Sequence, residues 1–191
     1  KVLGMLRGLM EGENVRLTAV DEADMPIIEE WFNDIKFLRH YDMLPAIPKN
    51  LKQVADMIKD YDDSQEKYIF AIRAKDTNRI IGVAGFDEII WSNGVSTVFI
   101  GIGNNNFTGK GIGAEAMRLL LDYGFNELNF YRIQLNVIAY NERAIKLYEK
   151  LGFTREGTLR EFIFRDGNRY DMYLYGLLRH EWSGFNGRKQ I

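Results

Sequence analysis

The sequence of 191 residues contains no cysteine, and this absence removes several kinds of chemistry at once. Disulfide frameworks, thiolate nucleophiles and sulfur-ligated zinc all require cysteine, and a chain without it suits a reducing compartment. The two histidines, His40 and His180, lie too far apart in the sequence to form a recognisable metal motif. We therefore expect no resident metal ion and a cytoplasmic location.

The chain also lacks a strong charge of either sign and a long apolar run. Its formal net charge is −2 with the two signs interspersed, whereas nucleic-acid binders carry a basic face. No apolar stretch approaches the roughly 20 residues that cross a bilayer. Arg7 and Glu11 interrupt any secretory hydrophobic segment near the beginning of the sequence. We expect partners other than nucleic acid or membrane.

Only three prolines punctuate the chain, and neither repeats nor low-complexity tracts divide it. This length suits one domain with a continuous core of its own. We expect a single catalytic domain over residues 14–182. An N-terminal extension, 1–13, and a C-terminal tail, 183–191, would flank it.

Strand-like and helix-like apolar patterns follow one another along the chain. Alternation predicts strands at 14–20, 68–73, 79–86, 95–102, 132–139, 153–164 and 169–178. Helical spacing predicts helices beginning at Asp21 or Asp24, at Asn50, near 113 and at Asn141. In the third of these helices Glu115 falls opposite the apolar stripe. The fold class is therefore α/β (α+β), with a mixed, mostly antiparallel sheet of about six to seven strands flanked by about four helices.

A glycine-rich turn, Thr108–Ala114, stands between a predicted strand and a predicted helix. Closely spaced glycines leave the first amides of a helix bare, and its positive dipole end favours phosphate groups. A P-loop is excluded, because Asn104 stands where its first glycine belongs and Gly111 where its hydroxyl belongs. A dinucleotide fingerprint remains an alternative, although a polar loop intervenes after the strand and Asn129 stands near the expected acid.

A second informative stretch is the predicted helix at 141–151. Asn141 and Tyr148 are two helical turns apart, so both can face one side with the small Ala144 between them. A ligand could lie along that side. The alternatives are that Asn141 simply caps the helix and that Tyr148 is a core residue.

The order of these features resembles a GNAT N-acetyltransferase: the turn at Gly109, the strand that follows it, the stretch 141–153 and then 156–159. The likeness spans roughly 15–182 and is greatest to ribosomal-protein and spermidine N-acetyltransferases. It implies acetyl-CoA as co-substrate, with pyrophosphate on the glycine turn, pantetheine along the strand before it and Asn141 holding the pantetheine arm. The implied cofactor-binding residues are Gly101, Ile102, Gly103, Thr108, Gly109, Lys110, Gly111, Ile112, Gly113, Ala114, Asn141 and Ala144.

The same resemblance implies direct attack of an amine on the thioester. Backbone N–H groups near Ile102 would stabilise the oxyanion. Tyr148 would be the general acid that protonates the departing thiolate, because the reference pKa of a phenol, about 10, lies above that of a thiol, about 8.5. Many relatives place a glutamate base on the strand before the glycine turn, but this chain has Val98 there. A water chain held by Glu88, Asp87 or backbone carbonyls is the substitute we expect.

The acceptor side of the predicted site is less defined by the sequence. Acidic side chains attract cationic amines, so the candidate acceptor-binding residues are Glu29, Glu30, Asp34 and Glu88. The loop 37–49 and the hairpin 162–170 would shape the pocket, with Phe37, Tyr41, Phe162 and Phe164. A protein N-terminus, a polyamine or another small amine would fit, and family habit predicts a homo-oligomer. The alternative reading, motivated by Val98, is a non-catalytic acyl-CoA-binding sensor.

Overall fold

A seven-stranded sheet forms the centre of the protein. The computed structural model describes residues 9–103, 107 and 109–184. The strand order is β1-β2-β3-β4-β5-β7-β6, and every neighbouring pair is antiparallel except β4 and β5. The strands are β1 (Val15–Thr18), β2 (Tyr68–Ala74), β3 (Ile80–Ile90), β4 (Val95–Ile102), β5 (Arg132–Ile138), β6 (Thr154–Arg165) and β7 (Asn168–Leu178). The predicted mixed, mostly antiparallel sheet is confirmed.

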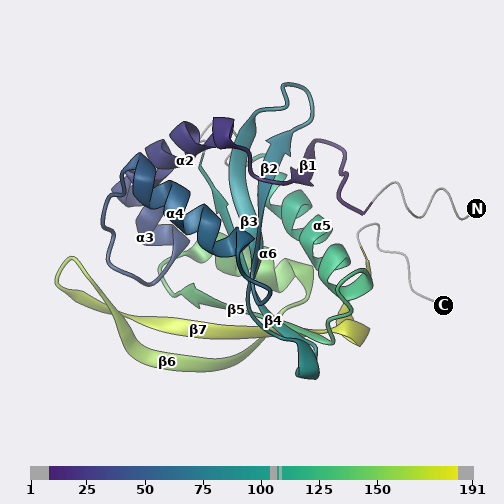
Figure 1. Cartoon of the computed structure of the whole chain (residues 1–191). Coiled ribbons are helices and arrows are strands. Elements are labelled where there is room, and N and C mark those ends of the chain that lie inside the picture. The colour runs from purple at the N-terminus through teal and green to yellow at the C-terminus, as the bar shows by residue number, and fades with distance from the viewer. Residues whose placement is uncertain (1–8, 104–106, 108, 185–191) are drawn as a thin grey trace, which may run out of the picture.

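Helices cover both faces of this sheet (Figure 1). On one face lie α2 (Met25–Phe32), α3 (Ile35–Tyr41) and α4 (Leu51–Asp62), and on the other lie α5 (Ile112–Asn126) and α6 (Glu142–Leu151). Each face therefore has its own apolar core. Within the described residues, no helix is long and apolar enough to cross a membrane.

Helix α3 corrects the prediction of a loop at 37–49, because residues 35–41 are helical. The Asp34 carboxylate caps it by accepting from the backbone N–H of Lys36 at 2.9 Å. Phe37 and Tyr41, one turn apart, stack at 5.2 Å, and both rings meet the edge of Phe32. Seven residues form too short a helix to be stable alone, so packing against α2 stabilises it.

Strands β4 and β5 pair over three residues and then separate. Val95–Thr97 pairs in parallel with Arg132–Gln134, after which no ladder joins the two strands. Beyond that point β4 stays paired with β3 as far as Ile102, and β5 with β7 as far as Ile138. We call the residues of β4 beyond the junction, Val98–Ile102, the open edge.

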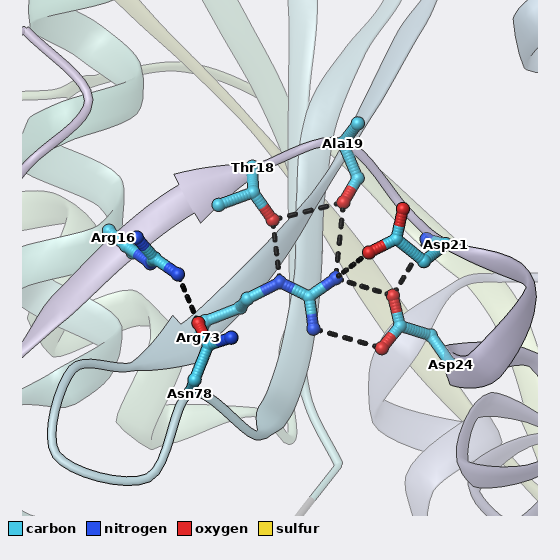
Figure 2. A network of polar contacts seen from close by, with 7 residues as sticks. All are labelled: Arg16, Thr18, Ala19, Asp21, Asp24, Arg73 and Asn78. Carbon is cyan, nitrogen blue, oxygen red and sulfur yellow. Dashed lines mark hydrogen bonds and ion pairs between the residues drawn. The ribbon is translucent and has the colours of Figure 1, made fainter.

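A buried ion pair joins the beginning of α2 to strand β2 (Figure 2). The guanidinium of Arg73, on β2, donates to both carboxylate oxygens of Asp24 at 2.9 and 2.6 Å, and both residues are buried. It also donates to Thr18 Oγ1 at 2.7 Å and to the Ala19 carbonyl at 3.2 Å. Because Asp24 directly precedes α2, this network fixes where α2 begins.

Glu115 is buried, contrary to its predicted place on the solvent side of α5. Its carboxylate accepts from the backbone N–H of Asn14 at 2.8 Å and from Asn14 Nδ2 at 3.3 Å. The predicted helix is present, but the segment before β1 covers this side of it. The spacing of apolar residues within a helix cannot predict that a distant segment will cover its polar side.

Candidate functional site

The open edge of β4 presents backbone N–H groups that pair with no strand among the described residues. The Gly103 N–H donates to the Ile81 carbonyl of β3 at 2.9 Å, and the Gly94 carbonyl accepts from Arg132 at 3.1 Å. Alternation along a strand then directs the even-numbered N–H groups, those of Val98, Ile100 and Ile102, away from β3 and toward the side of β5. Of the three residues predicted to line the pantetheine, Ile102 has this orientation, whereas Gly101 and Gly103 direct theirs to β3.

Gly101 and Gly103 also allow close packing of aromatic rings against β4. A Cβ on Gly103 would lie 2.0 Å from the Trp31 ring of α2, and one on Gly101 would lie 2.7 Å from the Tyr41 ring of α3. No side chain larger than hydrogen fits at either position without movement. The aromatic rings of α2 and α3 thus lie directly on the end of β4.

The glycine turn leads directly into α5, as the sequence predicts. Gly109 and Gly111 adopt positive φ values of 85° and 76°, which glycine accepts without steric cost. Gly111 is the N-cap of α5, and the space beside its Cα is open. Thr108, also predicted here, lies outside the described residues, while Lys110 is exposed, Ile112 buried and Ala114 half-buried.

The turn, the open edge and α6 meet at Gly113. A Cβ on this residue would lie 3.9 Å from Ile102 of β4 and 4.0 Å from Leu147 of α6. The exposed first amides of α5 are therefore adjacent to the end of the unpaired strand. This places a helix N-terminus, which favours anions, next to a row of free N–H donors.

Arg143, on the first turn of α6, is a candidate that the sequence reasoning missed. Its Nη2 lies 3.3 Å from the position that a Cβ on Gly109 would take, so the guanidinium borders the glycine turn. With Lys110 it adds positive charge where the helix dipole is already favourable. The available sequence signal was a basic residue two positions after Asn141, in the first turn of a helix.

Asn141 caps α6, as one of the two predicted readings required. Its Oδ1 accepts from the Ala144 N–H at 3.3 Å, and Ala144 is half-buried. The Nδ2 group donates to no described residue and stays available as a donor. The cap and a ligand contact are therefore compatible, because they use different atoms of the same amide.

Tyr148 lies in the second half of α6, next to the core. Its side chain is 8% exposed, and its ring meets Phe153 edge to face at 5.9 Å. Burial raises the pKa of Tyr148 to about 12, since desolvation disfavours the phenolate. The hydroxyl bonds to no described residue. It therefore keeps its proton at neutral pH and has it free to donate.

The four acids predicted to bind the acceptor fall into different places. Glu29 and Glu30 lie on α2, and neither forms an ion pair with a described residue, while Asp34 is used as the cap of α3. Glu88 alone among the four bonds to a residue at the junction of β4 and β5: its Oε2 accepts from Thr97 Oγ1 at 3.1 Å. Thr97 in turn accepts from Gln134 Nε2 at 3.4 Å.

The β6–β7 hairpin reaches beneath α3 (Figure 1). Arg39 of α3 makes two hydrogen bonds to Asp166 at the hairpin turn, at 2.8 and 2.9 Å. Arg165 donates to the Leu44 carbonyl at 3.0 Å. The exposed rings of Phe162 and Phe164 belong to this hairpin, whereas Phe37 and Tyr41 pack inside. The hairpin and α3 therefore bound the same side of the separated strands.

Comparison with known proteins supplies a family and several relatives. The Acetyltransferase (GNAT) domain matches residues 14–154. An uncharacterized N-acetyltransferase p20 of Bacillus licheniformis is 31% identical over 175 residues, covering 90% of this chain and 97% of that protein. The spermidine N(1)-acetyltransferase of Escherichia coli K12 is 26% identical over 171 residues, covering 88% of each.

Solved structures share the fold. The crystal structure of spermidine N-acetyltransferase from Vibrio cholerae in complex with CoA and spermine superposes with a TM-score of 0.81 at 24% identity, covering 89% of this chain and 98% of that one. A Bacillus anthracis acetyltransferase of the GNAT family superposes with a TM-score of 0.77 at 19% identity, covering 90% and 99%.

Proposed function

The chain belongs to the GNAT acetyltransferase family, and from this premise we propose that it transfers the acetyl group of acetyl-CoA to the primary amine of a small molecule or peptide. It is an N-acetyltransferase. The observation that carries the proposal is the meeting of the open edge with the first turn of α5 at Gly113. Binding of acetyl-CoA needs both backbone N–H donors for the pantetheine arm and a site for the phosphates.

Acetyl-CoA suits the residues that surround this meeting point. Amide groups of a pantetheine arm would add to β4 as another strand does, with the N–H groups of Ile100 and Ile102 as donors. The pyrophosphate would accept from the amides of Gly111, Ile112 and Gly113, beside Lys110 and Arg143. Asn141 Nδ2 would donate to the arm. The open space beside Gly111 leaves room for the pyrophosphate.

Tyr148 would act as the general acid. The amine attacks the thioester carbonyl carbon, and the C–S bond breaks as the C–N bond forms. The thiolate then takes the phenolic proton, which a pKa of about 12 leaves in place until it is needed. The proton that the new amide nitrogen loses would restore the phenol. An N–H group of the open edge would stabilise the oxyanion.

The acceptor belongs to the class of primary amines, and a polyamine is supported by the relatives named for spermidine. We propose residues 14–182 as the catalytic domain, since the family match covers 14–154 and β7 completes the sheet. We propose a cytoplasmic location, because a chain without cysteine suits a reducing compartment. Assembly into a homo-oligomer stays a prediction.

The test is acetyl-CoA turnover, measured as free thiol released with a panel of peptides and polyamines. Wild type should release thiol with at least one amine, and Tyr148→Phe should lower kcat by about 100-fold or more. Tyr131→Phe is the matched control, because Tyr131 is 55% exposed and lies before β5. Binding of acetyl-CoA without turnover on any amine would instead support the acyl-CoA-binding sensor that Val98 suggests.

A further inference from the structure

At the β4 position where the family resemblance implies a general-base glutamate, this chain has Val98, whose side chain is 4% exposed within the core under α5. The preceding residue, Thr97, points to the opposite face because side chains alternate along a strand. Thr97 is also the last residue of β4 that pairs with β5. A hydroxyl therefore stands at the point where the two strands separate, on the side of α3 and the β6–β7 hairpin.

The hydrogen bonds of Thr97 have a defined direction. An amide nitrogen can only donate and a carboxylate oxygen can only accept. Gln134 Nε2 donates to Thr97 Oγ1 at 3.4 Å, so the hydroxyl proton is directed to Glu88 Oε2 at 3.1 Å. The chain of contacts crosses three strands, from β5 through β4 to β3. The hydroxyl keeps a lone pair for a further donor.

Glu88 is held in an uncommon backbone conformation. Its φ of 51° lies in the left-handed region, at the irregularity where the pairing of β3 with β4 shifts between Asp87 and Ile90. Residues other than glycine rarely adopt this conformation, and such positions gather at functional sites. The bulge redirects the side chain of Glu88 toward Thr97.

We propose that Thr97 and Glu88 form the path by which the acceptor amine loses its proton, an inference that rests on the proposed function. The ammonium N–H bond breaks and its proton passes to Thr97 Oγ1, while the hydroxyl proton of Thr97 passes to Glu88 Oε2. The nitrogen lone pair thus freed forms the C–N bond. Glu88 is exposed and returns the proton to solvent.

Several charged groups surround this path, and Asp87 is the alternative proton acceptor among them. Asp87 precedes Glu88 on β3, Glu66 lines the same cavity of about 430 Å³ as Glu88, and Lys67 acts on Asp87 by its charge. Burial raises the pKa of Asp87, which a hydrogen bond from Tyr61 opposes. Asp87 faces Tyr61 of α4, whereas the bond to Thr97 belongs to Glu88.

The test compares pH profiles of kcat/KM for wild type, Thr97→Val and Glu88→Gln. Both variants should lose about 100-fold at pH 7, the contribution of a positioned base. The deficit should shrink as the pH approaches the pKa of the amine, because neutral amine then arrives from solution. Thr97→Ser keeps the hydroxyl and should retain the wild-type profile. Glu66→Gln removes a carboxylate from the same cavity and should retain it too.

Three outcomes separate the possibilities. Profiles of Thr97→Val and Glu88→Gln that run parallel to an active wild type would overturn this proposal alone. So would a loss that appears in Asp87→Asn and not in Glu88→Gln. A folded wild type that releases no thiol with any amine would overturn the proposed function, and this inference with it. Thermal melting of each variant separates lost chemistry from lost folding.

Discussion

Asp24→Asn should destabilise the protein far more than Asp21→Asn, although both carboxylates contact the same nitrogen of Arg73. The Asp24 side chain is 7% exposed and its oxygen lies 2.6 Å from Nη2. The Asp21 side chain is 75% exposed and its oxygen lies 3.3 Å away. The two substitutions remove the same charge, but Asp24 is buried and accepts from two guanidinium nitrogens, whereas Asp21 is exposed and accepts from one.

The expected magnitudes follow from that difference. Removing one partner of a buried ion pair costs about 3–5 kcal/mol, because the other charge is left buried without compensation. Asparagine keeps one acceptor oxygen, so we expect a value near the lower limit, about 3 kcal/mol. An exposed pair contributes about 0–1 kcal/mol. For a domain of this size, 1 kcal/mol shifts Tm by about 2–4 °C.

Urea unfolding at 25 °C and thermal melting measure both variants against wild type. Asp24→Asn should lower Tm by about 6–12 °C, and Asp21→Asn by at most about 4 °C. Because Asp24 fixes the beginning of α2, whose Trp31 lies on Gly103, acetyl-CoA binding should weaken as well. Equal losses in the two variants would refute the reasoning, since burial would then not decide the contribution of the pair.

Three further predictions concern the site. Because the pKa of Tyr148 is raised to about 12 from an ordinary 10.0, kcat should stay level through pH 10 and fall only as the pH approaches 12. A fall of kcat near pH 10 would exclude this residue as the acid. Gly103→Ala should cost about 1–3 kcal/mol in urea unfolding, since the new Cβ meets the Trp31 ring. Arg143→Ala should weaken acetyl-CoA binding by about tenfold or more in calorimetry, and Lys150→Ala, exposed at the other end of α6, should leave the affinity unchanged.

The sequence predicts features whose cause is local. The glycine turn precedes a helix, α5, and Asn141 caps α6 as its type and place favour. The strands and their antiparallel pairing follow from alternation and turn residues, and the resulting fold class is confirmed. The turn, the cap and the hairpins are decided by residues that lie close together in the sequence.

Features decided by distant segments were not predictable in this way. Glu115 is covered by Asn14, about 100 positions earlier in the chain. Arg143 reaches Gly109 only because α6 and the start of α5 meet in space. The role of Thr97 depends on where β4 and β5 separate, and no local pattern marks the third residue of β4 as the last that pairs. Contacts between segments far apart in the sequence decide all three features.

The short junction of β4 with β5 leaves these two strands joined by only three residues of pairing, although one apolar core lies under both. Strands β1–β4 carry the unpaired amides, and strands β5–β7 carry the long hairpin that reaches α3. Insertions or substitutions at the hairpin turn can therefore reshape one wall while the other keeps its register. Under the proposed function, such an arrangement would let acceptor preference change during evolution while β4, the strand proposed to face the thioester, stays the same.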